Sequence, residues 1–318
     1  LFRFDETEFT EETALMVTES NEIGYFEFDN VPAGNFLVRE IASPEAFVLT
    51  EEIFPVEITE DGQTIEITIE NQIIKGTAET IKVDADYPDH KLSGAVFEVY
   101  ADVDNNGEFN ADIDKLAGEM TETEPGLYQM KDLVYRNYFL HEKEAPEFFE
   151  KDDGYYPFSI TENEAIVRIE TEAGEGFLNK AQTGSLKVVK TADDDKVEGR
   201  TFKISGTDFM GNAYEQEFKT DENGEINLTL RVGEYTVSEV AGEDSEKYIL
   251  PDDQTVEIKA GETTTVKMHN KLVPEVPSVP QTGDNPWMPA ILGTLAGLAV
   301  LSGGALLFLR YTCLLYTS

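Results

Sequence analysis

The sequence predicts an all-β protein of tandem β-sandwich domains, followed by one membrane-spanning helix near the C-terminus. Short runs that alternate apolar and polar residues, as strands with one buried face do, recur through most of the chain. Tight-turn pairs separate such runs, at Asp61-Gly62, Asn106-Gly107 and Asn223-Gly224. No helical period of comparable strength occurs before the apolar segment at 287–309.

Length and composition indicate several folded domains with an acidic surface. The chain has 318 residues, more than one hydrophobic core usually serves. Its formal net charge is −40, from 64 Asp and Glu against 24 Lys and Arg, so its surface repels the phosphates of nucleic acid. Hydrophobic residues make up 40% of the chain and include 19 Phe and 13 Tyr, which favours packed domains over disorder. We therefore expect no nucleic-acid partner.

The two ends of the chain limit what can be expected of it. The chain begins at Leu1 without a visible secretory signal, so we expect an N-terminal region to be missing. The only cysteine is Cys313, so the domains have no disulfide and no thiolate metal site. Any covalent crosslink inside the domains must be of another kind.

One pattern of strands and loops occurs three times. Its copies are similar at residues 35–44, 137–146 and 234–241, and each copy ends in a strand that closes on an asparagine. In the first copy this closing strand is expected at residues 64–70, before Asn71. The first copy starts near Phe2 or Phe4, which corresponds to a phenylalanine that follows the opening strand in the other two copies. The opening strand of the first copy is therefore expected to be missing. The repeats and the C-terminal segments divide the chain into sandwich domains 1–74, 75–181 and 182–272, a proline-rich spacer at 273–286, the span 287–309 and a tail at 310–318.

Strand alternation places a glutamate of each repeat on the apolar face. Residues two apart in a strand share a face, as Leu140 and Glu142 do, and the closing asparagines are in phase with apolar residues in the same way. Desolvation raises the pKa of a buried Glu and lowers that of a buried Lys, so both tend to be neutral. A neutral amine is a nucleophile, and a glutamic acid can donate a hydrogen bond to an asparagine carboxamide. Such a trio can form a Lys–Asn isopeptide bond with loss of ammonia.

The repeats resemble the B-type repeats of collagen adhesins and the SpaA-like prealbumin domains of Gram-positive pilins. The family's Tyr-x-Leu-x-Glu-x-x-Ala-Pro line is matched at 138–146 and 36–44. The resemblance covers nearly everything before the spacer and implies prealbumin-like (reverse-Ig) sandwiches with internal crosslinks. The residues it assigns to these crosslinks are Lys82, Glu142 and Asn179; Lys190, Glu239 and Asn270; and, in the truncated first domain, Glu40 and Asn71.

Two departures leave an alternative open. The third domain lacks Ala-Pro after Glu239, and the second has six extra residues before Asn179. The alternative is that these side chains form an ordinary polar cluster without a bond.

The C-terminal segments resemble a sortase sorting signal. An uncharged run of 23 residues is roughly 34 Å long as a helix, and a bilayer core is roughly 30 Å thick. Before it stands a variant of the LPXTG pentapeptide with Val in place of Leu, and Arg310 follows it. The resemblance implies that a sortase thiolate attacks the carbonyl of Thr282. The tail lacks the cluster of Lys and Arg that usually ends a sorting signal, and it looks like the translation of a sequencing adapter. No function is therefore assigned to Cys313. The pentapeptide is Val279, Pro280, Gln281, Thr282 and Gly283.

One acidic loop has the donor spacing of a calcium site. Its oxygen-bearing side chains, two residues apart, are Asp102, Asp104 and Asn106. Gly107 follows where such a loop turns sharply, and Asp112 and Asp114 come later. However, Ile113 stands where a calcium loop has its last glutamate. Calcium is the one cofactor suggested, and a plain acidic turn is the alternative.

The sequence predicts a structural role and no enzymatic activity. The three histidines, His90, His141 and His269, occur singly, with His141 expected on an outer face, so they favour neither catalysis nor zinc binding. The expected role is the stalk of a secreted, cell-wall-anchored adhesin or accessory pilin, which passes through a single-pass membrane intermediate. Backbone pilins of the family carry a Tyr-Pro-Lys element, and Tyr87-Pro88-Asp89 lacks its lysine. This difference favours an accessory pilin or an adhesin over a backbone pilin.

The expected partners are a sortase, peptidoglycan or a neighbouring pilin subunit, and a host or extracellular-matrix ligand bound through the missing N-terminal region. One alternative is a non-catalytic spacer of a secreted wall-anchored enzyme whose catalytic domain lies upstream. Another is a calcium-dependent ligand-binding module.

Overall fold

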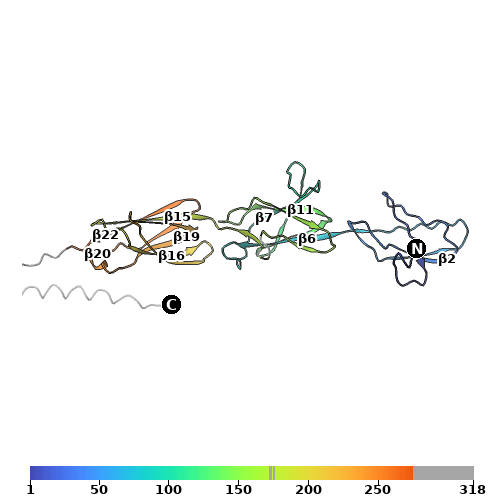
Figure 1. The fold of residues 1–318 in the computed structure, drawn as a ribbon, viewed down its shortest axis with the longest axis horizontal. Coiled ribbons are helices and arrows are strands. Elements are labelled where there is room, and N and C mark those ends of the chain that lie inside the picture. The colour runs from blue at the N-terminus through green and yellow to red at the C-terminus, as the bar shows by residue number, and fades with distance from the viewer. Residues whose placement is uncertain (172–173, 175, 275–318) are drawn as a thin grey trace, which may run out of the picture. The chain divides into compact units, whose positions relative to one another are not determined.

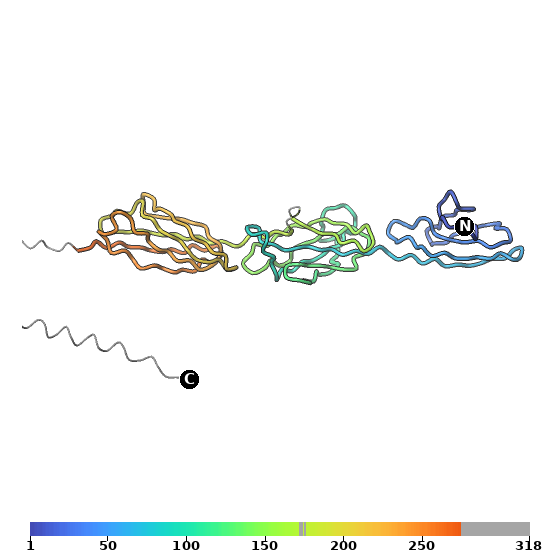
Figure 2. Tube along the Cα trace, turned by 90° about the horizontal axis from the view of Figure 1, so that it is seen from below, coloured from blue at the N-terminus to red at the C-terminus, as the bar shows by residue number. Residues whose placement is uncertain are grey.

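A computed structural model describes residues 1–171, 174 and 176–274 of the chain. Strands dominate this part (Figure 1), and its one helical element is the 3-10 turn η1 (Ser245–Lys247), so the prediction of an all-β fold is confirmed. Figure 2 traces the path of the same chain from a second side. Nearly all of the predicted spacer, the pentapeptide, the span 287–309 and the tail lie outside these residues. Among the residues described, no helix is long and apolar enough to cross a membrane.

Residues 183–272 form a sandwich of two four-stranded sheets. The strand orders are β18-β15-β22-β20 and β17-β16-β19-β21. Alternation along β15 turns Leu186, Val188 and Lys190 to the inside, where they face Val237 and the other apolar side chains of one core. The bounds are β15 (Thr183–Ala192), β16 (Thr201–Asp208), β17 (Ala213–Lys219), β18 (Glu225–Arg231), β19 (Gly233–Glu239), β20 (Tyr248–Ile249), β21 (Gln254–Ile258) and β22 (Thr263–Leu272).

Residues 75–179 form a second sandwich of the same kind. One sheet has the order β13-β6-β10-β9, with β14 also paired to β6, and the other has the order β12-β11-β7-β8. Its core is aromatic, since the ring of Phe97 lies edge-on to Tyr128 at 5.1 Å and to Phe177 at 4.9 Å. The bounds are β6 (Lys75–Asp84), β7 (Val96–Ala101), β8 (Lys115–Glu119), β9 (Thr121–Glu124), β10 (Leu127–Val134), β11 (Arg136–Glu144), β12 (Tyr155–Ile160), β13 (Ile166–Arg168) and β14 (Phe177–Asn179).

The closing strand of the second domain is interrupted. β13 runs parallel to β6 with Ile166 opposite Thr77, and β14 continues with Phe177 opposite Lys82. Between these points the closing strand advances eleven residues while β6 advances five. β13 and β14 are therefore two separate stretches of the closing strand, and Asn179 keeps its place beside β6. In the third domain β22 pairs with β15 without a break.

Residues 1–73 form a smaller group of strands, and one predicted strand is absent from it. A strand was expected at 64–70, but the structure shows none there, so that prediction is wrong. In the other domains the closing strand pairs with the opening strand, and residues 1–73 contain no opening strand that could pair with it. The sheets are β1-β2-β4 and β3-β5, with bounds β1 (Phe2–Arg3), β2 (Gly34–Arg39), β3 (Phe47–Val48), β4 (Ile53–Ile58) and β5 (Gln72–Ile73).

The outer face of β11 is covered rather than exposed. His141 lies on that face, yet it is only 8% exposed because its ring stacks on Tyr155 at 4.2 Å. Its Nδ1 atom also lies 3.0 Å from the carbonyl oxygen of Gly154. The histidine therefore serves packing. Phe109, from the loop between β7 and β8, stacks on the same Tyr155 ring.

Arg231 links the second and third sandwiches. Its guanidinium lies 2.5 Å from Asp84 Oδ2, at the end of β6, and 3.2 Å from Asp208 Oδ2, at the end of β16. The same group lies over the rings of Tyr87 at 5.0 Å and Phe209 at 5.4 Å. Because both aspartates are almost completely buried, this arginine supplies the positive charge that they require.

Replacing Arg231 with methionine is expected to lower the free energy of unfolding by about 2 kcal/mol, since two charge-assisted contacts are lost. Methionine retains the apolar packing against the rings. Chemical denaturation of the full chain measures the effect, with Arg136→Met on the exposed start of β11 as the control. Equal stability of the two variants would contradict the role given to Arg231.

Candidate functional site

The second domain brings Lys82, Glu142 and Asn179 together between its sheets. Lys82 comes from β6, Glu142 from β11 and Asn179 from β14. The Lys82 Nζ atom lies 3.1 Å from Glu142 Oε1 and donates a hydrogen bond to Asn179 Oδ1. Asn179 Nδ2 in turn lies 2.9 Å from both carboxylate oxygens of Glu142. The three side chains thus form a closed set of contacts, and each residue is at most 3% exposed.

The surroundings of Lys82 favour its neutral amine. Its Nζ atom lies 4.4 Å from the centre of the Phe177 ring and 5.9 Å from that of Phe97. Burial lowers the pKa of Lys82 from 10.5 to about 8, although the charges of Glu142 and Asp152 act in the opposite direction. A substantial fraction of the amine is therefore nucleophilic at mildly alkaline pH.

Two further groups, which sequence reasoning missed, hold Glu142 in place. The backbone amide of Asp152 donates to Glu142 Oε2 at 2.8 Å. Tyr156 donates its hydroxyl to Asp152 Oδ2 at 2.7 Å, which fixes that loop. No spacing in the sequence points to these contacts, because they depend on how the chain after β11 folds back. The first domain has a similar contact, from the Thr50 amide to Glu40 Oε2 at 3.3 Å.

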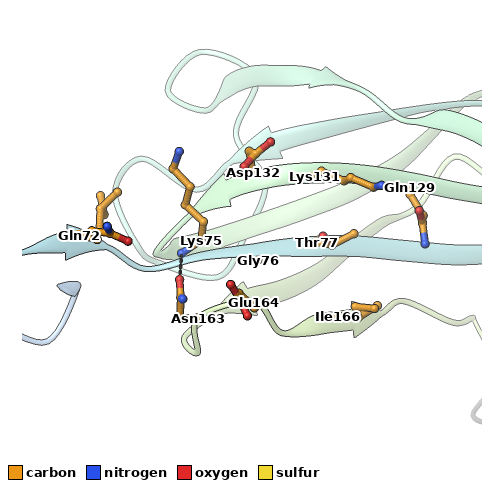
Figure 3. A pocket seen from close by; sticks show the side chains of 11 residues that line it. Gln72, Lys75, Gly76, Thr77, Gln129, Lys131, Asp132, Asn163, Glu164 and Ile166 are labelled. Atoms are coloured by element: carbon orange, nitrogen blue, oxygen red, sulfur yellow. Dashed lines mark hydrogen bonds between the residues drawn. The ribbon is translucent and has the colours of Figure 1, made fainter. Parts of the chain in front are cut away.

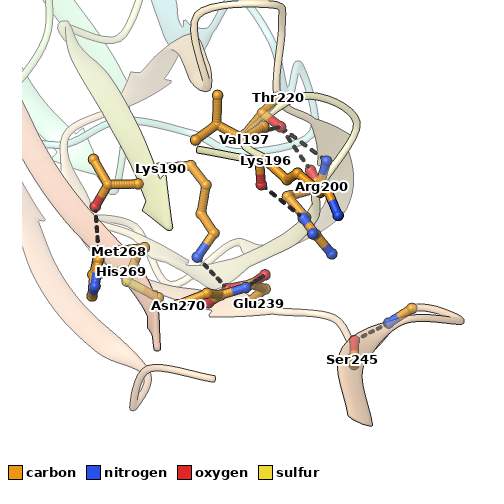
Figure 4. Close-up of polar contacts among 12 residues, drawn as sticks. Lys190, Lys196, Val197, Arg200, Thr220, Glu239, Ser245, Met268, His269 and Asn270 are labelled. Atoms are coloured by element: carbon orange, nitrogen blue, oxygen red, sulfur yellow. Dashed lines mark hydrogen bonds and ion pairs between the residues drawn. The ribbon is translucent and has the colours of Figure 1, made fainter. Parts of the chain in front are cut away.

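The third domain places Lys190, Glu239 and Asn270 in the same way (Figure 4). Lys190 Nζ lies 3.0 Å from Glu239 Oε2, and Asn270 Nδ2 donates to Glu239 Oε1 at 2.7 Å. The Lys190–Glu239 contact is an ion pair by distance but lacks hydrogen-bond geometry, and Asn270 Oδ1 has no partner. Burial lowers the pKa of Lys190, against the effect of Glu239. The cluster has the same three members as that of the second domain, but Asn270 contacts one carboxylate oxygen rather than two and the Lys–Asn hydrogen bond is missing.

The first domain holds two members of such a cluster. Asn71 Nδ2 donates to Glu40 Oε1 at 2.7 Å. Residues 1–74 contain no lysine, and Asn71 Oδ1 is buried without a hydrogen-bond partner. The first domain as it stands in this chain therefore has no amine for a crosslink of its own.

In the acidic loop of the second domain, three carboxylates come together. Two of them belong to the predicted calcium site, and the third takes the place of Asn106. Asp102, Asp104 and Asp114 each offer a carboxylate oxygen, and these atoms lie within 4.8 Å of one another. The side chain of Asn106 is instead used within the loop, since its Nδ2 donates to Asp104 Oδ2 at 3.0 Å and its Oδ1 accepts from the Glu108 amide at 2.7 Å. Asp114 stands one place beyond the position of the last ligand in a calcium loop, so the spacing of the sequence does not by itself select it.

A pocket of about 730 Å³ lies elsewhere, beside the start of β6 (Figure 3). Among its lining residues, Asn163 accepts a hydrogen bond from the backbone amide of Lys75 at 3.1 Å. None of the residues that line it belongs to the Lys–Glu–Asn clusters. Lys131 and Asp132 are also among its lining residues.

Comparisons with known proteins agree with this architecture. The SpaA prealbumin-like fold domain model matches residues 4–73, 76–175 and 184–272. A solved structure of the Bacillus anthracis TIE protein is 25% identical with a TM-score of 0.59, covering 80% of this chain and 45% of that one. This chain thus spans less than half of that protein.

Two pilin structures also match, at lower similarity. The minor pilin of Streptococcus agalactiae is 18% identical over 65% of this chain and 99% of its own, with a TM-score of 0.28. The shaft pilin of Lactobacillus rhamnosus GG is 15% identical over 64% of this chain and all of its own, with a TM-score of 0.27. Both scores are too low to support a conclusion, and no curated protein matches. With three matched segments over most of its length, the chain belongs to the SpaA prealbumin-like fold domain family.

Proposed function

We propose that this chain is the stalk of a wall-anchored adhesin or accessory pilin, stiffened by one Lys–Asn isopeptide bond in each of its second and third domains. The observation that carries the proposal is the fully buried contact of Lys82 with both Glu142 and Asn179. An unreacted buried ion pair of this kind contributes little to stability, because desolvation of the charges offsets their attraction. A covalent bond gives the same three residues a clear structural purpose.

The bond forms from groups already in contact. Glu142 accepts the proton of the Lys82 ammonium, 3.1 Å away, and leaves a neutral amine. The amine nitrogen attacks the Asn179 side-chain carbonyl carbon, while the protonated Glu142 steadies the carboxamide group. As the C–N bond of the carboxamide breaks, the attacking nitrogen gives up one proton and the departing nitrogen gains one through Glu142, so that ammonia leaves. The product is a secondary amide, and no oxidant or cofactor takes part.

The position of the bond suits a stalk. Lys82 belongs to the opening strand of its domain and Asn179 to the closing strand, and these two strands run parallel side by side. A force that pulls on the two ends of the domain is then transmitted through the crosslink from the opening strand to the closing strand. The strands between Lys82 and Asn179 bear no load and stay folded. Lys190 and Asn270 stand on β15 and β22 in the same relation.

Anchoring is proposed from the sequence beyond the described residues. The pentapeptide Val279-Pro280-Gln281-Thr282-Gly283 precedes an apolar segment of membrane-spanning length. In this proposal a sortase forms a thioester at Thr282 and transfers it to an amine of peptidoglycan or of another subunit. Incubation with a sortase and an amine acceptor should release the segment after Thr282, and the Thr282→Ala variant should stay intact.

Intact mass of the full chain tests the crosslinks. Each bond removes one ammonia, about 17 Da, so the chain is expected to be about 34 Da lighter than its sequence. Lys82→Met and Lys190→Met should each lose half of this deficit, compared with the mass of their own sequence. Lys187→Met, on the exposed side of β15, is the matched control and should keep the full deficit. A chain of unmodified mass would contradict the crosslinked stalk.

A further inference from the structure

The loop between β7 and β8 in the second domain, residues 102–114, is folded around its own carboxylates. Asp102 Oδ2 accepts the Gly107 amide at 3.0 Å. Asp114 accepts the Val103 amide with Oδ1 at 2.9 Å and the Asn110 amide with Oδ2 at 2.7 Å. These bonds draw the two ends of the loop together, and both aspartates are buried, at 2% and 5% exposure.

The negative charge of this loop is not balanced by the protein. The carboxylates of Asp102, Asp104 and Asp114 lie within 4.8 Å of one another. Among the residues that the structure describes, none of the three forms an ion pair. The ammonium of Lys143, on the neighbouring β11, contacts Glu98 and Glu119 instead. Like charges this close, two of them desolvated, repel each other strongly.

An unpartnered oxygen provides a second, independent observation. Asp102 is only 2% exposed, and its Oδ1 atom has no hydrogen-bond partner. A buried carboxylate oxygen without a partner is costly, and native structures rarely leave one so. The oxygen belongs to the carboxylate that meets those of Asp104 and Asp114, where a cation would satisfy all three.

We propose that Asp102, Asp104 and Asp114 bind one calcium ion. The donors are carboxylate oxygens, which select a hard cation over zinc or copper. Calcium takes six to eight oxygens in irregular geometry, so three carboxylates on a bent loop can be completed by water and backbone carbonyls, whereas magnesium requires a near-ideal octahedron. The expected dissociation constant is on the order of 10⁻⁴ to 10⁻³ M, the range of extracellular modules.

The ion would fix a loop that covers the side of the sandwich. Phe109, in the middle of the loop, stacks on Tyr155 at 3.6 Å and lies 5.9 Å from Phe139. Tyr155 in turn stacks on His141. Holding the two ends of the loop together keeps Phe109 on this outer face of β11 and β12. Calcium would therefore stiffen the domain at a place that the Lys82 cluster, on the inner face, does not reach.

The test compares the full chain with two variants of equal net charge. Asp102→Asn removes a charge from the cluster but retains an oxygen for the Gly107 amide. Asp112→Asn removes a charge from the exposed part of the same loop. Equilibrium dialysis against radioactive calcium counts the bound ions, and hydrogen exchange reports on amides 103–110, with calcium, with magnesium and with chelator.

The wild-type chain and Asp112→Asn are expected to bind one more calcium ion than Asp102→Asn, and calcium should slow exchange in the loop at least tenfold in these two alone. Hydrogen exchange in chelator should be no faster in Asp102→Asn than in the wild type, because the substitution relieves repulsion; this result shows that the variant is folded. Equal calcium binding by Asp102→Asn would overturn the site, and equal protection by magnesium would overturn the choice of ion.

Discussion

Replacing Lys82 with methionine is expected to lower the free energy of unfolding of the second domain by about 5 kcal/mol. Lys82 and Asn179 are 97 residues apart in the chain, and closing a loop of that size restricts the unfolded chain by about 4.7 kcal/mol in the chain-entropy treatment. Methionine fills a similar volume but cannot form an amide. Guanidinium denaturation of the full chain, followed by circular dichroism, measures the difference.

Lys75→Met is the matched control for this experiment. Lys75 stands on the same strand, β6, but its side chain is exposed and forms no crosslink. Its substitution should change the free energy of unfolding by about 0.5 kcal/mol or less. If the Lys82 and Lys75 variants unfold at the same denaturant concentration, the covalent bond is absent from the folded protein.

The uncrosslinked Asn179→Ala variant is expected to become more stable as the pH rises from about 8 to 10.5. This variant keeps Lys82 as a free buried amine, whose pKa burial lowers from 10.5 to about 8. Within that interval the unfolded chain binds more protons than the folded chain, so stability increases with pH. Below pH 8 the Lys82 amine is protonated in both the folded and the unfolded chain, so it no longer makes stability depend on pH. The full gain is about 3.5 kcal/mol, because the two pKa values differ by about 2.5 and a difference of one corresponds to about 1.4 kcal/mol.

The double variant Lys82→Met with Asn179→Ala isolates this effect. Tyrosines and other lysines titrate in the same interval, and they do so in both variants. The free energy of unfolding, measured by denaturation at several pH values, should therefore rise more steeply with pH in the single variant than in the double variant. The difference between the two slopes is due to Lys82. Parallel pH profiles would show that Lys82 titrates normally in the fold and is not prepared for attack.

Several parts of the fold could be predicted from local pattern. The period of two in the strands identifies the β class and the inner face, because each strand has one buried side. The same rule places Glu142 and Glu239 among apolar residues, and both lie in the domain interior. Lys190 is in phase with Leu186 and Val188 in the same way, whereas the residues before Lys82 are small or polar and leave its phase open. The burial of Lys82 follows from the central place of β6, between β10 and the closing strand.

Other features depend on pairing between distant segments. Residues 64–70 alternate like a strand but form none, since a strand requires a neighbour to bond with and that neighbour is not among residues 1–73. The six extra residues of the second domain can be counted in the sequence, but where the closing strand resumes its pairing cannot, because register is set by the partner strand.

By itself, the sequence determined the β class, the repeat and the residue types of each cluster, since alternation and chemistry are local properties. The tertiary structure alone decided which oxygens meet. It brought Asp114 rather than Asn106 to Asp102, and it covered His141 with Tyr155. Such contacts follow from the path of loops and from the packing of one sheet face, and these depend on residues far apart in the chain.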